Sequence, residues 1–148
     1  MKVTTDLKTL YQIDDLQWLE ATIKLLKSKR LNELDLDNLI EELEDLGNER
    51  RSAVESLLEQ VIRHLLVCQY WQAESEINGN HWRAEIIGFR NQLERRLTTN
   101  LRNYLGHQLP KTYQAALKYV QQKTGFEVEF PLDCPYSLEQ LLETNWLP

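Results

Sequence analysis

Glycine, proline and cysteine are scarce in this chain, and it has no long apolar run. Its 148 residues include 5 glycines, 4 prolines and 2 cysteines. So few turn-forming residues argue against a β protein, while a hydrophobic fraction of 42% argues against disorder. No segment approaches the ~20 apolar residues that span a bilayer, and residues 1–10 lack a signal-peptide pattern. We therefore expect a helical, cytoplasmic protein that makes no membrane contact.

The cysteine count and the length set two further expectations. Cys68 and Cys134 are far apart in sequence, and thiols of cytoplasmic proteins are normally reduced, so we expect neither a disulfide nor a cofactor held by them. A chain of this length has the size of one ordinary domain. Because no repeat or linker interrupts it, the sequence predicts a single all-helical domain over residues 1–148.

A helical stripe occupies the middle of the chain. Its members recur at alternating steps of four and three, the spacing at which residues share one face of an α-helix. The pattern predicts one long amphipathic helix covered by other helices, with Gly47-Asn48 as the place where it would bend or break. The stripe consists of Leu36, Ile40, Leu43, Gly47, Arg50, Val54, Leu57, Val61, His64, Cys68 and Trp71.

Two more helices are predicted on either side of this stripe. Over residues 15–29, a second, narrower apolar stripe (Leu16, Leu19, Ile23, Leu26), which Trp18 and Leu25 widen, predicts a helix that faces the core. Residues 78–80, Asn-Gly-Asn, have turn chemistry, and Asn80 can cap a helix over residues 81–97.

The C-terminal third predicts a further helix and an extended segment. Residues 98–100 interrupt the pattern, and Pro110 either kinks the next helix or begins one that reaches Lys123 and ends at Gly125. Residues 126–130 read as an extended strap, and Ser137 with Gln140 forms a capping-box pattern before a short helix. The predicted fold is all-α, a bundle of four to five helices with one long central helix, a C-terminal strap and a short last helix.

Charge is unevenly distributed along the chain. Residues 33–60 carry ten acids and two bases, a net of −8, whereas residues 81–123 carry eight bases and two acids, a net of +6. Opposite segments attract one another within one chain or between chains. The pattern favours a protein partner or self-association, such as a homodimer, over a nucleic acid.

Arginines supply the first candidate binding residues. Arg50 falls near the centre of the long stripe, where a guanidinium needs an anionic partner. Three interpretations are open: a structural ion pair, an arginine exposed because the helix breaks at Gly47, and an anion site. Arg83 and Arg90 share one helical face beside Trp82 and suit a phosphate, a carboxylate or an acidic helix such as residues 41–45. A nucleic-acid module using the basic helix from Arg83 to Arg102 is an alternative, and it requires one exposed stripe that holds Arg83, Arg90, Arg95, Arg96 and Arg102.

Histidine and acidic residues supply the second set. His64 and Cys68 are four residues apart, a spacing at which two side chains share a metal ion, but two ligands do not make a site and no metal is expected. No Glu-x-x-His pair of the kind found in di-iron bundles occurs. An enzyme with a metal or acid/base site near Glu42, His64 and His81 remains an alternative.

Several short motifs resemble a known family across nearly the whole chain. They are residues 41–47 (Glu-Glu-Leu-Glu-Asp-Leu-Gly), residues 64–66 with Gln69-Tyr70, Trp82-Arg83 with Ile86 and Arg90, residues 134–136 (Cys-Pro-Tyr) and residues 146–148 (Trp-Leu-Pro). The chain resembles domain-of-unknown-function family 29, which is found mainly in bacteria, cyanobacteria prominently. The resemblance implies an all-helical fold and brings no assigned activity. Our leading hypothesis is therefore a small helical interaction or assembly module without catalytic activity; any small-molecule ligand is left open.

Overall fold

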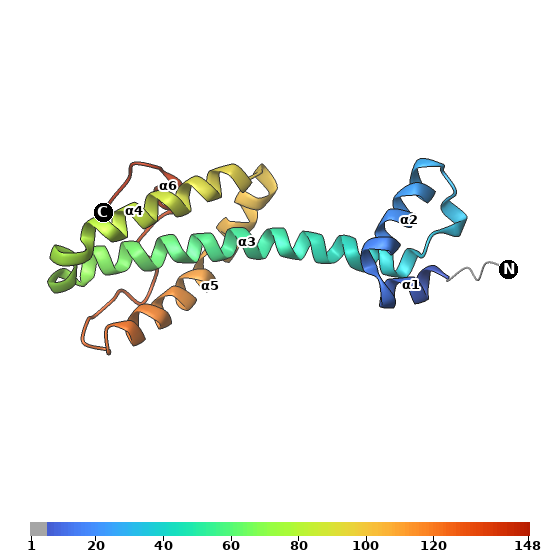
Figure 1. Cartoon of the computed structure of the whole chain (residues 1–148). Coiled ribbons are helices and arrows are strands. Elements are labelled where there is room, and N and C mark those ends of the chain that lie inside the picture. The colour runs from blue at the N-terminus through green and yellow to red at the C-terminus, as the bar shows by residue number, and fades with distance from the viewer. Residues whose placement is uncertain (1–5) are drawn as a thin grey trace. The chain divides into compact units, whose positions relative to one another are not determined.

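The computed structural model describes residues 6–148 and is mainly helical, with no strand among those residues (Figure 1). The predicted all-α fold with one long central helix is confirmed, although the described residues form six α-helices rather than four or five. The additional elements are short. The helices are α1 (Leu7–Ile13), α2 (Asp15–Lys27), the 3₁₀-helix η1 (Leu31–Glu33), α3 (Leu36–Tyr70), α4 (Gln72–Arg96), α5 (Thr99–Lys123) and α6 (Leu138–Leu142).

Helix α3 runs without interruption through Gly47. Its 35 residues span about 52 Å at 1.5 Å per residue. A single glycine costs only about 1 kcal/mol in a helix interior, which the remaining turns of a long helix tolerate. The helix ends at Tyr70, one residue short of the predicted Trp71.

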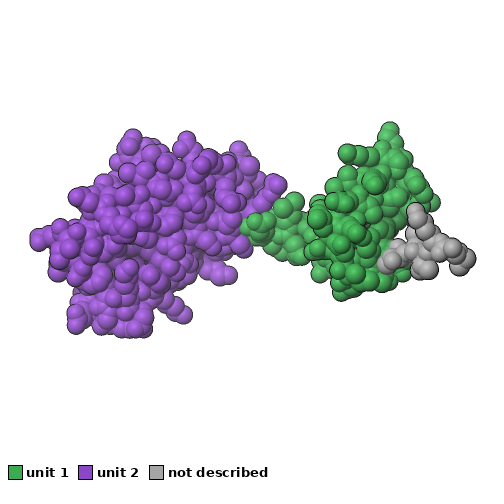
Figure 2. Space-filling view, viewed as in Figure 1, with its two compact units in different colours: residues 1–49 green, residues 50–148 purple. Residues whose placement is uncertain are grey.

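The chain divides into two compact units (Figure 2). The first comprises residues 1–49 and the second residues 50–148. Helix α3 contributes its first turns to one unit and its remaining turns to the other. We describe each unit by itself, and the expectation of one domain stays a prediction.

The first unit is organised around Trp18, which is 1% exposed. The ring of Tyr11 on α1 packs edge-on against Trp18, with centroids 4.9 Å apart. The indole Nε1–H of Trp18 donates to Oδ2 of the buried Asp35, at 3.3 Å. Asp14 caps α2 by accepting from the Gln17 backbone N–H. Helix α2 is therefore held by its Trp18 side.

The predicted core-facing stripe of α2 is instead exposed. Leu16, Leu19, Ile23 and Leu26 are each between 41% and 61% exposed, while Trp18 and Thr22 are buried. The reason is rotational: α1 and Asp35 contact the Trp18 face of α2, which leaves the neighbouring leucine and isoleucine face uncovered. The expectation of a core-facing stripe is therefore wrong for these four leucine and isoleucine residues, whereas Trp18, which widens the stripe, is buried.

The second unit has a conventional apolar core. It is formed by the later turns of α3, by α4, α5 and α6, and by the segment before α6. Helix α3 supplies most of its branched aliphatic side chains. Its fully buried members include Val54, Leu58, Val61, Ile62, Leu65, Leu66, Ile86, Leu93, Leu105, Tyr113, Ala116, Val120 and Leu141.

Helix α4 passes straight through residues 78–80, so the predicted turn there is wrong. The Asn78 amide donates to Glu74 Oε2 at 2.9 Å, and the Arg83 guanidinium donates to Asn80 Oδ1 at 2.5 Å. Both asparagines thus bond along the helix surface rather than to the backbone in a turn. The chain reverses at Trp71 instead, between α3 and α4.

Helix α5 begins and ends where the sequence predicted. The Thr98 hydroxyl accepts from the Leu101 N–H and caps its start. At its end Gly125 adopts φ 64°, and the Phe126 N–H donates to the Gln121 carbonyl, the bond of a Schellman motif. Pro110 lies inside α5, so it does not begin a helix.

The C-terminal strap and short helix are confirmed. Residues 126–130 contain no strand, and the capping box of Ser137 and Gln140 opens α6. The Tyr113 hydroxyl donates to the Pro131 carbonyl at 2.5 Å, and the Tyr136 hydroxyl donates to Gln69 Oε1 at 2.8 Å. These bonds attach the strap to α5 and α3.

Candidate functional site

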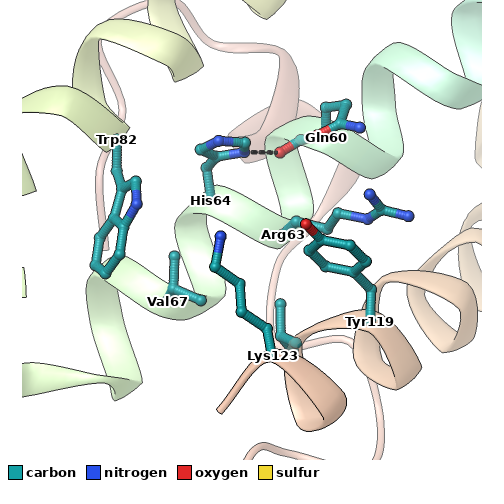
Figure 3. A pocket seen from close by; sticks show the side chains of 8 residues that line it. Gln60, Arg63, His64, Val67, Trp82, Tyr119 and Lys123 are labelled. Carbon is teal, nitrogen blue, oxygen red and sulfur yellow. Dashed lines mark hydrogen bonds between the residues drawn. The ribbon is translucent and has the colours of Figure 1, made fainter. Parts of the chain in front are cut away.

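A hollow of about 80 Å³ lies among α3, α4 and α5 in the second unit (Figure 3). Helix α3 contributes side chains spaced three and four residues apart, and one aromatic wall comes from α4 and another from α5. Lys123 extends from the last turn of α5 into the space between those walls. The side chains used below are Gln60, Arg63, His64, Trp82, Tyr119 and Lys123.

His64 is half-buried and held in one orientation. Its Nδ1 lies 2.7 Å from the Gln60 carbonyl oxygen, which can only accept, so Nδ1 carries the proton. The ring also packs against Phe89, with centroids 5.3 Å apart. Burial lowers the pKa of His64 below 6.5, which the Gln60 carbonyl and the charge of Glu85 partly oppose. Its imidazole is therefore uncharged at neutral pH.

The cations of this hollow stack on an aromatic ring. The Arg63 guanidinium lies 3.7 Å from the Tyr119 ring centroid and forms an ion pair with Glu59. The Lys123 ammonium lies 5.8 Å from the same centroid. Within residues 6–148, Arg63 Nε is buried without a hydrogen-bond partner. Trp82 forms the opposite wall and stacks on Trp71.

The hollow combines basic side chains with aromatic walls. None of the described residues that line it is a carboxylate. Such a lining suits an anion rather than a cation. Sequence analysis identified His64 and Trp82 but missed Arg63, Tyr119 and Lys123, because α5 reaches this position only after the chain has folded.

The residues suggested for a metal or acid/base site occupy different surroundings. Cys68 is half-buried, and burial raises the pKa of its thiol, which favours the protonated form. No group of three His, Cys, Asp or Glu side chains able to hold a metal ion occurs among residues 6–148. Glu42 lies in the first unit, where it accepts from the Tyr11 hydroxyl at 2.5 Å and raises the pKa of Tyr11 to about 12. His81 is exposed on α4, and its charge lowers the pKa of His64.

Arg90 is buried and holds the C-terminal segment. Only 3% of Arg90 is exposed, and its Nε donates to the Leu141 carbonyl at 2.8 Å. Its two terminal nitrogens donate to the carbonyls of Gln140, Thr144 and Trp146. These acceptors lie at and beyond the end of α6, where helix carbonyls lack partners within the helix. Burial lowers the pKa of Arg90.

The arginines proposed as a binding cluster therefore occupy different environments. Arg83 is exposed and donates to Asn80, although it borders a hollow of about 180 Å³ together with Arg90 and Leu147. Arg50 is exposed rather than buried, and it borders a hollow of about 270 Å³ with Arg96. Their roles in binding stay predictions.

The basic segment from Arg83 to Arg102 is not one helix. Helix α4 ends at Arg96 and α5 begins at Thr99, so the segment bends between them. Arg90 is buried, so the five arginines do not share one exposed stripe. This removes the geometry that the nucleic-acid alternative required.

The first unit carries an apolar surface that sequence analysis placed in a core. On α3, Leu36, Ile40, Leu43 and Leu46 are between 44% and 59% exposed, and on α2 the four members of the narrower stripe are also exposed. We call these eight side chains the leucine–isoleucine surface.

None of the helices formed by the described residues has the length and apolar character needed to cross a membrane. Neither a curated protein nor a solved structure matches the chain. A family model described as domain of unknown function DUF29 matches residues 10–147. The match covers nearly the entire sequence, and the chain belongs to this family.

Proposed function

We propose that this protein is an interaction module whose leucine–isoleucine surface binds a cationic amphipathic helix of another protein. The observation that carries the proposal is the exposure of eight leucine and isoleucine side chains within one small unit. Burying each such side chain is worth about 1.5–3 kcal/mol relative to leaving it in water. Exposed leucine and isoleucine side chains gathered in one small unit are typical of interaction sites.

The charge around the surface specifies the partner. Residues 1–49 carry twelve acids and six bases, so this unit holds the entire net charge of −6. On α3 the stripe is flanked by Asp37, Glu41 and Glu44, spaced so that they lie along one side of it. An apolar stripe beside a row of carboxylates matches a helix with leucines on one face and lysines or arginines at its edge.

A second copy of this chain is a poorer occupant of the same surface. Two first units meeting face to face would bring a net charge of −6 against −6. Such like-charge pairing opposes association, most strongly at low salt. A basic partner would be attracted to the acidic unit, whereas a second copy of the chain would be repelled by it.

Fluorescence anisotropy of a labelled synthetic peptide tests this proposal. The peptide is a helix of leucine and lysine in an amphipathic pattern, titrated with the full chain. We expect saturable binding that weakens as salt rises, and a loss of about tenfold in affinity for Leu43→Gln, because one apolar anchor is removed. Ile77→Gln is the matched control, since Ile77 is an exposed isoleucine of α4 outside the surface.

The remaining outcomes discriminate among occupants. A peptide with glutamate in place of lysine should not bind; equal binding of the two peptides contradicts the charge argument. Sedimentation velocity of the full chain provides the other arm. A dimer that Leu43→Gln dissociates, with no peptide binding, identifies a second copy as the occupant and refutes the proposed partner.

A further inference from the structure

We propose that the hollow among α3, α4 and α5 binds one phosphate group, as the free ion or as part of a small phosphorylated molecule. Its volume of about 80 Å³ is room for several water molecules, which is enough for a single tetrahedral anion. This site lies wholly in the second unit, whereas the leucine–isoleucine surface belongs to the first, and it does not depend on the proposed function.

Two basic side chains and a histidine line this hollow. Arg63 approaches from α3, Lys123 from the end of α5, and His64 lies one helical position from Arg63 (Figure 3). Guanidinium and ammonium groups donate charge-assisted hydrogen bonds to phosphate oxygens. The separation of these residues along the sequence means that the folded helices create the site.

One side chain that lines the hollow carries an unsatisfied donor. Arg63 Nε is buried and lacks a hydrogen-bond partner in the described chain, a state that costs free energy unless an acceptor reaches it. Stacking on Tyr119 holds the guanidinium plane in place, and the Lys123 ammonium lies between the Trp82 and Tyr119 rings. The donors are therefore positioned before any anion arrives, which reduces the entropic cost of binding.

Other charged groups near the hollow limit the affinity. On α3, Glu59 already pairs with Arg63; on α4, Glu85 acts on His64 together with His81; on α5, Lys123 is the nearest cation. Neither glutamate lines the hollow itself. An anion therefore meets the basic groups first, while the two carboxylates weaken its binding from outside.

Titration of the full chain with inorganic phosphate, followed by NMR, tests the site. Chloride at matched ionic strength serves as the reference. We expect saturable shifts of the Trp82 indole N–H and the His64 ring, and a loss of about tenfold in affinity for Lys123→Met, the factor expected when one charge-assisted hydrogen bond is removed. Lys118→Met is the matched control because Lys118 is an exposed lysine of α5 that does not line the hollow.

Glycerol phosphate separates the two sources of the anion. Tighter binding of the ester than of the free ion identifies a phosphorylated small molecule as the ligand, and binding of inorganic phosphate alone identifies the free ion. Either result supports the site. No saturable shift with either probe, or equal losses in Lys123→Met and Lys118→Met, overturns it.

The response to pH supplies a second readout. Sulfate is used here because its charge is constant over the range, and its negative charge favours protonated His64. Sulfate affinity should therefore increase as pH falls below 6.5, and His64→Gln should remove most of that dependence. His81 is the other histidine whose charge reaches this region, so His81→Gln is the control and should retain it. A pH dependence that follows His81 rather than His64 contradicts the geometry.

Discussion

The two units of this protein use the same kind of helix in opposite ways. Along α3, Val54 and Val61 are fully buried in the second unit, whereas Ile40 and Leu43 of the same stripe are exposed in the first. The second unit supplies α4 and α5 to cover its part of α3. In the first unit α1 and α2 contact each other. The leucine and isoleucine stripe of α2 and the first part of the α3 stripe remain exposed. An apolar stripe therefore predicts that other apolar side chains pack against it. It does not indicate whether those side chains belong to the same chain or to a partner.

The charged residues of the two units also differ. The second unit has eleven acids and eleven bases, and one of its arginines is used inside to hold the C-terminal carbonyls. The first unit is strongly acidic, and its single well-buried carboxylate, Asp35, accepts from Trp18 and Asn38. The unit with balanced charge thus has a covered apolar core, whereas the unit with excess negative charge has exposed leucine and isoleucine side chains.

The largest expected effect is on the first unit, whose core depends on one residue. Trp18→Ala should destabilise that unit by about 4 kcal/mol, because few other buried side chains remain to replace the lost packing. Amide NMR spectra should show residues 6–49 losing dispersion while the second unit keeps its spectrum. Equal loss in both units would show that the division between them has no energetic meaning.

A pair of leucines on α3 compares the two units directly. Leu58 is 0% exposed and Leu43 is 59% exposed. Leu58→Ala should lower the free energy of unfolding by about 3 kcal/mol, whereas Leu43→Ala should change it by less than about 0.5 kcal/mol. Urea denaturation followed by circular dichroism measures both. Similar losses would mean that Leu43 is covered in solution.

The buried arginine is the next test. Arg90→Met should cost about 2 kcal/mol, because it leaves the buried Leu141 carbonyl and the part-buried carbonyls of residues 140, 144 and 146 without their donor. Hydrogen exchange should increase in α6, and thermal unfolding should shift to lower temperature. Arg95→Met is the control, since Arg95 is exposed on the same helix. A wild-type melting curve for Arg90→Met would contradict the role of Arg90 in holding the C-terminal segment.

The smallest effect is a pH dependence from His64. Its folded pKa is lower than its ordinary value of 6.5, so the unfolded chain binds a proton first as pH falls. Stability is therefore fully present above that value and decreases as pH falls below it. His64→Gln should flatten the difference between unfolding curves measured at neutral and mildly acidic pH; an unchanged slope assigns the effect to other groups.

Much of the fold could be predicted because its signals are local. The apolar periodicity of α3, the interruption at residues 98–100, the Ser137 cap and the Gly125 terminus depend on neighbouring residues, and all appear where expected. The predicted turn at residues 78–80 was wrong because the two asparagine side chains there form hydrogen bonds along the surface of α4 instead. The candidate site was only half visible, since Lys123 and Tyr119 join His64 through packing across helices rather than through a motif.

The sequence by itself determined that the chain is helical, where most helices begin and end, and which face of each is apolar, because these depend on hydrogen bonds and spacing within a few turns. Only the tertiary structure decided which apolar faces are covered, that Arg90 is buried while Arg50 is exposed, and that His64, Arg63 and Lys123 border one hollow. Those outcomes depend on how helices rotate and pack against one another. Residue spacing along one helix carries no information about its neighbour.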